Sequence, residues 1–498
     1  MPDMSDGLPL VGVVGAGTMG AGIAQVAAVA GHRVLLADAV DGAAHRAADQ
    51  IKERVRAQVA KGRLNVDPDA LDIAPAATSK MAAAGIVIEA VLEDLSVKRR
   101  LFAELEQTVT ADCLLASNSS SLTPTAMAAG LAHPGRLVGL HFFNPVPAMR
   151  LVEVISGLAT APAAADRAEA LARAWGKTVV RSAATPGFIV NRIARPFYAE
   201  AWRLREEHAA APEVIDAVLT GAGGFRMGPF ALMDLIGHDV NEAVTRSVWA
   251  SFGYDPRFAP SLAQRSLVEA GWLGRKTGRG CYDYADGATP PTPAPAPLKP
   301  APAFAAAPAD SQFNVLLDRS GGRRQESPAE PDTVELPSGA ALVRCAGATA
   351  SALARGAGRP VIAVDRTLDD ATATAIAVAP SHDCPAAALD EAVGLLQSAG
   401  LQVFVIDDVP GLIVTRTVAM LANLAADAVA GQVATAGDVD TAMRLGVNYP
   451  EGPLAWADRW GLGTVLATLD ELDGWYRDGH YRASPLLRRA MLTGTALT

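Results

Sequence analysis

The sequence predicts an α/β domain, then an all-α domain, a small degenerate α/β module and a second copy of the all-α domain. Three observations lead to this prediction. Apolar runs alternate with helical patterns through residues 1–183, an apolar helical pattern follows from Pro186 to about Gly253, and one segment of the chain is repeated far downstream. The 498 residues also exceed one ordinary core, at roughly 100–200 residues per domain.

The apolar runs of the first domain have the length of buried strands. They occupy residues 10–15, 34–38, 86–91 and 114–118, and a further pair lies within 139–155. Their alternation with helical patterns is typical of a parallel sheet wound with helices. We therefore assign residues 1–184 to the α/β domain and residues 185–285 to the first all-α domain.

The helical domain occurs twice. "TPGFIVNRIA" at 185–194 recurs as "VPGLIVTRTV" at 409–418, and the offset of 224 residues then holds for about fifty residues without a gap. Such a register indicates duplication rather than chance, so residues 408–498 form the second copy. Asn191 is replaced by Thr415 there, and the two copies therefore differ chemically.

The segment between the helical domains divides into a linker and a module. Eight prolines stand among alanines between Pro290 and Pro308, a composition that favours extended chain over packing. Residues 286–335 are therefore predicted to be a Pro/Ala-rich linker. The apolar runs within 336–407 predict a small α/β module, and it has no glycine-rich phosphate loop.

Composition narrows the class of protein. A net charge of -10 and a pI near 5.4 argue against general binding to nucleic acid or anionic membrane. The four cysteines are scattered without metal-ligand spacing, which predicts reduced thiols and no metal site. The chain begins without a signal-peptide pattern and has no uncharged apolar stretch long enough to span a membrane. We expect a cytoplasmic protein.

A glycine-rich turn predicts a Rossmann-type dinucleotide site. "VVGAGTMGAGIAQ" places Gly15, Gly17 and Gly20 between a strand and a helix, where they allow a tight turn, approach of a pyrophosphate and close helix packing. Asp38 ends the second strand, and its carboxylate can bind ribose hydroxyls but repels a 2′-phosphate, which favours NAD over NADP. Alternatively, Asp38 only caps the following helix.

Four polar residues suggest a catalytic site: Ser120 after "LLASN", His141 in "RLVGLHF", Glu153 in "LVEVI" and Asn191 in the helical domain. If "NPVPAMR" reverses the chain, Glu153 approaches His141 and fixes its tautomer. The imidazole could then take a proton from a secondary alcohol as hydride leaves to a nicotinamide, while Ser120 and Asn191 stabilise the carbonyl oxygen. Alone, however, a strand histidine is more often a satisfied core residue, and Ser120 more often a helix cap.

These motifs resemble the L-3-hydroxyacyl-CoA dehydrogenases, including the bacterial 3-hydroxybutyryl-CoA dehydrogenases. The matching segments follow the family's order over residues 8–285: "GAGTMGAGIAQ", "EAVLEDLSVK", "SNSSSL", "GLHFFNPVPAMRLVEVI" and "TPGFIVNRI". The resemblance implies reversible NAD-dependent oxidation of an (S)-3-hydroxyacyl-CoA to a 3-oxoacyl-CoA in β-oxidation of fatty acids. It implies that His141 is the base, that Glu153 is its partner, and that Ser120 and Asn191 contact the reacting oxygen.

The resemblance also implies contacts to the cofactor and to CoA. The residues it places beside the cofactor are Ala90, Glu93, Lys98 and Asn144. Without it, Glu93 and Lys98 would be a solvated pair at a helix start. Lys52 and Arg56, one helical turn apart, are expected near the anionic CoA group, or else belong to a solvated helix face.

The second half resembles that of the bacterial dehydrogenases of phenylacetate degradation, which oxidise 3-hydroxyadipyl-CoA. Members with one helical domain dimerise through it, so we expect a homo-oligomer or an internal pseudo-dimer of the two copies. Arg226 is a candidate contact for a distal substrate carboxylate. Two alternatives stay open: a non-enzymatic structural or sensor relative, and a β-hydroxyacid dehydrogenase that acts on free acids, usually with a lysine as base.

Overall fold

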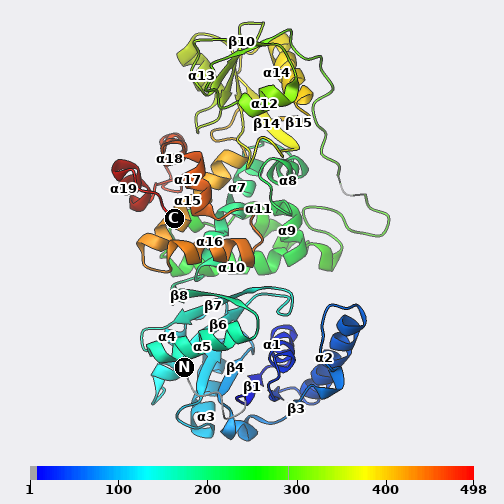
Figure 1. Ribbon diagram of the computed structural model, residues 1–498, viewed down its shortest axis with the longest axis vertical. Helices are drawn as coiled ribbons and strands as arrows, with labels where there is room; N and C mark the ends of the chain where they lie inside the picture. The colour runs from blue at the N-terminus through cyan, green and yellow to red at the C-terminus, as the bar shows by residue number, and fades with distance from the viewer. Residues whose placement is uncertain (1–7, 290) are drawn as a thin grey trace. The chain divides into compact units, whose positions relative to one another are not determined.

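The computed structural model describes residues 8–289 and 291–498, which fall into two compact units (Figure 1). The first unit runs to Arg192 and takes in Gly431–Val447. The second comprises Ile193–Ala430 and Asn448–Thr498. Each unit contains a β-sheet, and the two are described separately below.

The first sheet has eight strands among the described residues, in the order β3-β2-β1-β4-β5-β6-β7-β8. All neighbours are parallel except β6 and β7, which are antiparallel. The strands are β1 Val11–Val14, β2 Val34–Ala37, β3 Ile73–Pro75, β4 Ile86–Glu89, β5 Leu114–Ser117, β6 Leu137–Phe142, β7 Leu151–Ser156 and β8 Thr178–Ala183.

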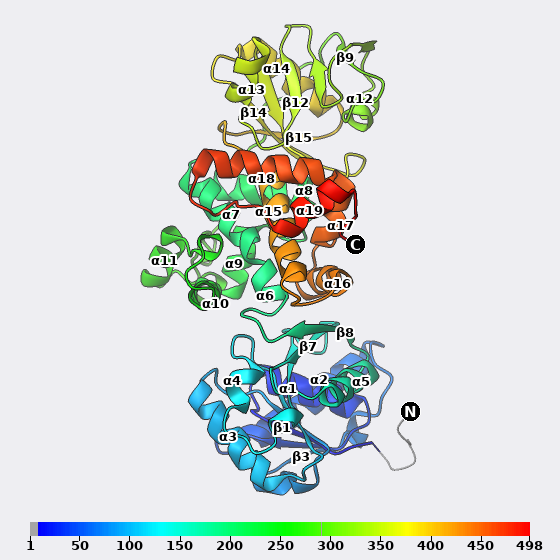
Figure 2. The ribbon, with the colours of Figure 1, turned by 90° about the vertical axis from the view of Figure 1, so that its left-hand side faces the viewer.

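Helices cover both faces of this sheet, which confirms the predicted wound α/β architecture. α1, α2 and α5 share one core with alternate strand residues, and α3 and α4 share the core of the other face. Figure 2 shows α3 and α5 on opposite sides of the sheet. The helices are α1 Thr18–Val29, α2 Ala43–Ala60, α3 Leu95–Thr108, α4 Pro124–Ala128, α5 Pro162–Ala174 and α6 Val190–Ile193, with 3₁₀ turns η1 Pro68–Ala70, η2 Thr78–Ala83 and η3 Pro134–Arg136.

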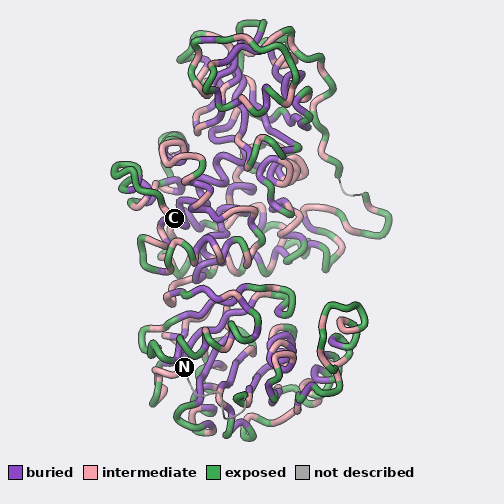
Figure 3. Tube along the Cα trace, viewed as in Figure 1, coloured by how far each residue is buried: buried purple, intermediate pink, exposed green. Residues whose placement is uncertain are grey.

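The second unit contains the first helical copy and most of the second. The first copy has α7 Arg195–Glu206, α8 Pro212–Gly221, α9 Pro229–Ile236, α10 His238–Ser251 and α11 Leu262–Glu269, with turns η4 Pro256–Phe258 and η5 Arg275–Thr277. The second copy has α15 Val414–Ala430, α17 Pro453–Trp460, α18 Leu462–Tyr476 and α19 Pro485–Thr493. α15 packs against α7 and is buried along nearly its whole length (Figure 3). Across the described residues, no helix is long and apolar enough to cross a membrane.

The second sheet also belongs to this unit, in the order β10-β9-β11-β12-β13-β14-β15. Its strands are β9 Ala305–Ala307, β10 Arg324–Glu326, β11 Thr333–Glu335, β12 Ala341–Arg344, β13 Val361–Val364, β14 Ala375–Pro380 and β15 Gln402–Val405. Its helices are α12 Asn314–Ser320, α13 Ala350–Ala357 and α14 Ala386–Ser398.

The structured module begins earlier than the composition indicates. Residues 305–335, predicted as linker, contain β9, α12, β10 and β11 and contribute Phe313 and Leu317 to the core. Before them, residues 291–304 form no helix or strand, and this segment is held to α14 through hydrogen bonds between Gln397 and the backbone of residues 296–299. Prolines supply backbone carbonyls for such bonds, so a proline-rich segment can line a module without being a free linker.

The duplication extends further towards the N-terminus than the sequence motif reveals. The bounds of β7 and β14, and those of α5 and α14, are displaced by the same offset as the helical copies. The pairing is also preserved: β13 is antiparallel to β14 and β14 is parallel to β15, as in β6, β7 and β8. The small module is therefore a degenerate duplicate of the carboxyl-terminal half of the first α/β domain.

A second-copy helix, α16 Ala436–Gly446, belongs to the first unit and packs on β7 and β8. The Ala183 backbone N–H donates to the Val433 carbonyl at 2.8 Å. A Cβ on Gly446 would lie 2.7 Å from Leu151 and 3.0 Å from Val190, so this helix approaches the sheet too closely for a larger residue.

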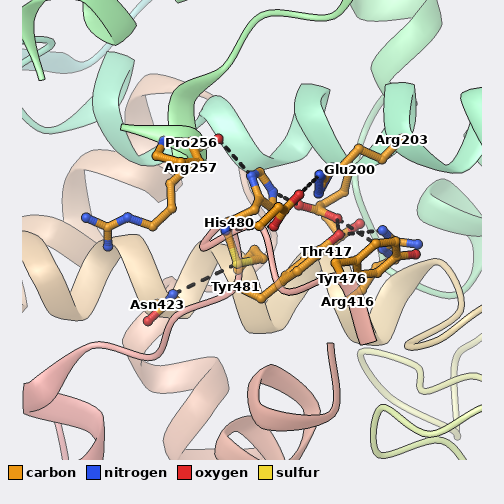
Figure 4. Close-up of polar contacts among 12 residues, drawn as sticks. Glu200, Arg203, Pro256, Arg257, Arg416, Thr417, Asn423, Tyr476, His480 and Tyr481 are labelled. Carbon is orange, nitrogen blue, oxygen red and sulfur yellow. Dashed lines mark hydrogen bonds and ion pairs between the residues drawn. The ribbon is translucent and has the colours of Figure 1, made fainter. Parts of the chain in front are cut away.

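A buried polar cluster joins the two helical copies within the second unit (Figure 4). The Glu200 carboxylate on α7 accepts bonds from Arg416 Nε on α15 at 3.0 Å and from Tyr481 Oη at 2.8 Å. His480 faces acceptors on both sides, the Glu200 carboxylate at 2.7 Å and the Pro256 carbonyl at 3.1 Å. Burial alone would raise the pKa of Glu200, but the nearby His480 and Arg416 outweigh it and lower that pKa to about 2.

Candidate active site

The antiparallel pair β6–β7 brings His141 and Glu153 directly opposite each other. His141 Nδ1 lies 2.6 Å from Glu153 Oε2, and both side chains are buried. A carboxylate only accepts, so Nδ1 carries the proton and Nε2 is left with its lone pair. The ring centres of Phe143 and Phe188 lie 4.5 and 5.9 Å from the centre of the imidazole ring, and the two rings shield it. The geometry is that of an oriented histidine base.

The other oxygen of Glu153 binds the chain that leads into the helical domain. Oε1 accepts from the backbone N–H groups of Ile189 and Val190 at 3.1 and 3.0 Å. These amides stand at the start of α6, where a carboxylate is favoured. Asn191 is the next residue, so one carboxylate fixes both the imidazole and the backbone that carries Asn191.

The three serines that follow β5, residues 119–121, make different contacts. Ser119 and Ser121 donate to Glu93 Oε1 at 2.5 and 2.8 Å. Within the described part of the chain, the Ser120 hydroxyl has no such bond and is half-buried. The Phe142 N–H donates to Asn118 Oδ1 at 2.8 Å and ties the end of β6 to the end of β5. Ser120 therefore follows the strand beside the one that bears His141.

The glycine turn has the shape that the sequence predicts. A Cβ on Gly15 would lie 2.3 Å from the Ala90 carbonyl oxygen, and one on Gly20 would lie 1.8 Å from Gly15 O. A Cβ on Gly17 would meet nothing within 4 Å, so this side of the turn is open for a pyrophosphate. The Ala90 carbonyl lies against the same turn, and the contact of Ala90 with the cofactor stays a prediction.

Asp38 supports the turn directly. Its carboxylate accepts from the Ala16 N–H at 2.6 Å and the Val40 N–H at 2.8 Å. It does not cap the following helix, whose N-cap is Gly42. The loop, the open side at Gly17 and this acid fit an NAD adenosine and pyrophosphate.

Lys98 is buried rather than solvated. Its ammonium lies 2.6 Å from Glu89 Oε1 and 3.1 Å from Glu93 Oε2. Burial would raise the pKa of Glu93, but Lys98 and the two serines lower it to about 2. Glu89, which also accepts from Ser117 Oγ at 2.6 Å, was not identified from the sequence. A glutamate that ends an apolar strand just before the "LEDLSVK" helix start is the signal that could have indicated it.

The predicted CoA contacts, Lys52 and Arg56, do not line the cavity that the first unit has beside α2. Arg56 forms an exposed ion pair with Asp69. A cavity of about 650 Å³ lies between α1, α2 and the β6–β7 turn, and its cations include Arg54 and Arg63. Because an α-helix turns every 3.6 residues, Arg54 faces away from Lys52 and Arg56 on α2. Asn144, in the exposed β6–β7 turn, follows the same strand as His141.

The second repeat lacks the catalytic set. At the offset that relates the two copies, Asp365 replaces His141, Ala377 replaces Glu153 and Leu368 replaces Asn144. The Asp365 carboxylate instead accepts from the Ile413, Val414 and Thr415 N–H groups at 2.7–3.0 Å. The second repeat thus keeps a carboxylate that caps the incoming helix but has no histidine at the position of His141.

Asp234, His238 and Cys281 form a cluster of potential metal ligands in the first helical copy. The Asp234 carboxylate already accepts from the Cys281 and Tyr282 N–H groups, at 2.8 and 2.9 Å. Its counterpart, Asp458, holds the chain end in the same way through the Leu497 N–H at 3.0 Å. The repeated role is structural.

Comparisons with known proteins agree with this site. A model of the 3-hydroxyacyl-CoA dehydrogenase NAD-binding domain matches residues 10–185, one of the corresponding C-terminal domain matches 187–284 and 411–496, and one of the 3-hydroxybutyryl-CoA dehydrogenase reduced Rossmann-fold domain matches 342–410. The fold and site therefore define an NAD-dependent oxidoreductase.

The chain belongs to the 3-hydroxyacyl-CoA dehydrogenase family. It is 44% identical to the 3-hydroxyadipyl-CoA dehydrogenase of Escherichia coli K12 over 97% of both chains. It is 41% identical to a probable 3-hydroxybutyryl-CoA dehydrogenase of Bacillus subtilis, over 55% of this chain and 96% of the relative. The crystal structure of a 3-hydroxybutyryl-CoA dehydrogenase from E. coli K12 matches with a TM-score of 0.88 and 42% identity, covering 98% of this chain and 99% of the other.

Proposed function

We propose that the chain oxidises an (S)-3-hydroxyacyl-CoA to the 3-oxoacyl-CoA, with His141 as the catalytic base. The observation that carries this proposal is the 2.6 Å contact between His141 Nδ1 and Glu153 Oε2. Because Nδ1 donates to the carboxylate, Nε2 receives the proton of the 3-hydroxyl. NAD, when bound, accepts the hydride from C3. Two electrons and one proton thus leave C3 as hydride, and the second proton stays on the imidazole.

Glu153 stabilises the imidazolium that this step produces. Its charge is fixed in a buried position by the Ile189 and Val190 amides, so little reorganisation is needed as the proton arrives. Ser120 and Asn191 are assigned as neutral donors to the developing carbonyl oxygen. In the reverse direction the imidazolium returns its proton to that oxygen.

The acyl group is proposed to be a dicarboxylyl group such as 3-hydroxyadipyl. The full-length match to a 3-hydroxyadipyl-CoA dehydrogenase supports this choice, because the module and second helical copy are included in it. Arg226, exposed in the first helical copy, is the candidate cation for the distal carboxylate. Arg54 and Arg63, which line the cavity beside α2, are proposed as further contacts for CoA phosphates, and the prediction for Lys52 and Arg56 stays a prediction.

The test compares initial NADH formation from 3-hydroxyadipyl-CoA, 3-hydroxybutyryl-CoA and a long-chain homologue, with NADP as a control. The wild type should prefer the dicarboxylyl substrate and NAD, and His141→Gln should lower turnover by about 10²- to 10⁴-fold with NADH binding preserved. Near-wild-type turnover of that variant would refute the mechanism. Equal kcat/KM for the adipyl and butyryl substrates would refute only the assigned acyl group.

The free-acid alternative with a lysine base finds little support at Lys98. Its ammonium is buried between Glu89 and Glu93 and is therefore occupied as a counter-ion. Activity on 3-hydroxy acids without CoA would favour that alternative, and activity on the thioesters alone would exclude it.

For the assembly, we propose an internal pseudo-dimer of the two helical copies. The α7–α15 packing and the Glu200–Arg416 pair support it. A chain ending at Ala285 would expose the α7 face that α15 covers, so it should dimerise or aggregate in light scattering. A fully folded, monomeric truncated chain would contradict this proposal.

A further inference from the structure

The second repeat contains a cavity of about 390 Å³ that the oxidation does not use. Arg366 and Leu368, just after β13, line it together with Arg344 at the end of β12 and Trp460 at the end of α17. At the offset between the copies, Arg366 and Leu368 correspond to Phe142 and Asn144. The cavity therefore lies where the duplicated fold has its site after β6, but different residues line it.

Arg366 is a half-buried cation that forms no ion pair within the described part of the chain, and its acidic neighbours Asp365 and Asp332 act on it only from beyond ion-pair distance. Among the described residues, no carboxylate lies within 4.0 Å of its guanidinium. Its Nε donates to the Cys345 carbonyl at 2.8 Å, and Nη2 approaches Gln312 Oε1 at 3.3 Å. The guanidinium carbon lies 5.6 Å from the centre of the Trp460 ring. Burial and the neighbouring Arg344 lower the pKa of Arg366 to about 10.

The other charges at this cavity are already compensated. Arg344 pairs with Asp370 at 2.6 Å, and Arg459 pairs with Glu451 at 2.6 Å. The remaining acid, Asp369, is exposed and accepts hydrogen bonds from its own turn. Among the described cations that line the cavity, Arg366 is thus the one that forms no ion pair.

We propose that this cavity binds a small aromatic anion, in which one phosphate or carboxylate group is carried by a flat ring. The anionic group would pair with the Arg366 guanidinium, whose planar donors suit either oxyanion. The ring would lie against the apolar surface of Trp460, Leu368 and Val315. The volume falls in the range of small-molecule sites, roughly 300–1,000 Å³.

This assignment differs from a purely structural role of Arg366. As a structural link, Arg366 would only join the module to α17 through Cys345 and Trp460. Its replacement would then lower the melting temperature and change no binding isotherm. A ligand site predicts a loss of binding that variants of two different lining residues share.

The experiment uses the full-length protein saturated with NAD and a 3-oxoacyl-CoA, a pair that cannot react because both are oxidised. The N-terminal nucleotide and substrate sites are then filled. Equilibrium dialysis measures labelled adenosine 5′-monophosphate in one arm and labelled benzoate in the other, so that phosphate and carboxylate ligands are distinguished. We expect one ligand per chain in at least one arm, with adenosine or benzamide binding at least tenfold more weakly.

The variants are Arg366→Gln and Trp460→Leu, each expected to weaken that binding at least tenfold. Arg359→Gln is the matched control, because Arg359 lies in the same module, pairs with Glu335 and is absent from the cavity. It should leave binding unchanged. Circular dichroism checks folding, and Trp460→Leu keeps the test valid if Arg366→Gln unfolds. No saturable binding in either arm, or equal binding by wild type and Arg366→Gln, would overturn the proposal.

Discussion

Asp365 occupies in the second sheet the position that His141 occupies in the first, and it faces Ala377 where His141 faces Glu153. The carboxylate that caps the incoming helix has thus moved from β7 to the end of β13. Its backbone partners are equivalent: Ile189 and Val190 in one repeat, Ile413 and Val414 in the other. Helix capping is therefore separable from the proposed catalysis, and of these two carboxylates Glu153 is the one that we propose to perform both.

Replacing Glu153 by Gln should impair the chemistry more than the fold. The amide still offers an oxygen to the backbone amides but no longer carries the charge that stabilises the imidazolium. We expect kcat to fall by about 10²-fold or more, with NADH affinity retained. Steady-state kinetics and NADH fluorescence titration measure the two quantities. An unchanged kcat would show that Glu153 only caps the helix.

Asn191 and Thr415 should respond oppositely to replacement. Asn191→Ala should lower kcat because a donor to the developing oxygen is lost. Thr415→Val should leave kcat unchanged but lower the free energy of unfolding by about 1–3 kcal/mol, because its hydroxyl binds the buried Asp365 carboxylate at 2.7 Å. Kinetics and urea unfolding of both variants test this. Equal losses of kcat would mean that the second repeat also forms a catalytic site.

Gly446→Val should disturb the active site from the second helical copy. A Cβ at this position would press on Leu151 and Val190 and would lie 3.6 Å from Phe143, whose ring contacts His141. A displacement near 1 Å lowers turnover on the order of 10²-fold. The control is Gly437→Val on the same helix, where a Cβ meets nothing within 4 Å. Parallel kcat measurements decide, and similar values for the two variants would exclude this coupling.

Glu200 should make stability depend on pH in the acid range. Its pKa is lowered to about 2 in the folded chain, against about 4.3 for a free glutamate. The unfolded chain therefore binds this proton more readily, so the stabilisation is complete above about pH 4.3 and is lost as pH falls towards 2.

Glu200→Gln removes the fully buried carboxylate beside Arg416, which then keeps only the half-exposed Glu207 at 3.3 Å, and should cost about 3–5 kcal/mol at pH 7. The difference from wild type should shrink between pH 4.3 and 2. Glu269→Gln, in an exposed pair with Arg265, should cost less than about 1 kcal/mol. Chemical denaturation at pH 7, 5 and 3 measures both, and a gap for Glu200→Gln that stays constant over this range would contradict the assignment.

The sequence predicts the fold where apolar residues recur at regular spacing and where glycine or proline marks the turns. The glycine turn, the wound sheet, the hairpin that pairs His141 with Glu153 and the duplicated helical domain follow from local pattern. The duplication of β6–β8 escaped detection because a buried strand requires apolar residues but no particular ones. Ala377 and Glu153 share a position yet no chemistry, so only strand pairing reveals their equivalence.

Side-chain environments are harder to predict than elements. From the sequence alone, Lys98 at the start of α3 is expected to be solvated. In the structure its ammonium is buried because it pairs with Glu89 at the end of β4. On α2, Lys52 and Arg56 stand one helical turn apart, and this spacing made them the predicted pair of CoA contacts. Which helix face borders a cavity, however, depends on the β6–β7 turn far downstream in the chain.

One offset of 224 residues relates the two repeats, so the chain contains part of the same fold twice. One copy has the proposed catalytic residues and the other does not. Of the proposed catalytic positions, His141, Glu153 and Asn191 have counterparts at this offset in the second repeat: Asp365, Ala377 and Thr415. A saturation mutagenesis library scored for growth on the substrate should therefore tolerate replacements at the half-buried Leu368 that are lost at Asn144. It should tolerate small apolar replacements at the buried Ala377, whereas apolar replacements at Glu153 should be lost. The helix-capping carboxylates, Asp365 and Glu153, should be intolerant in both halves, which would separate the residues kept for shape from those kept for chemistry.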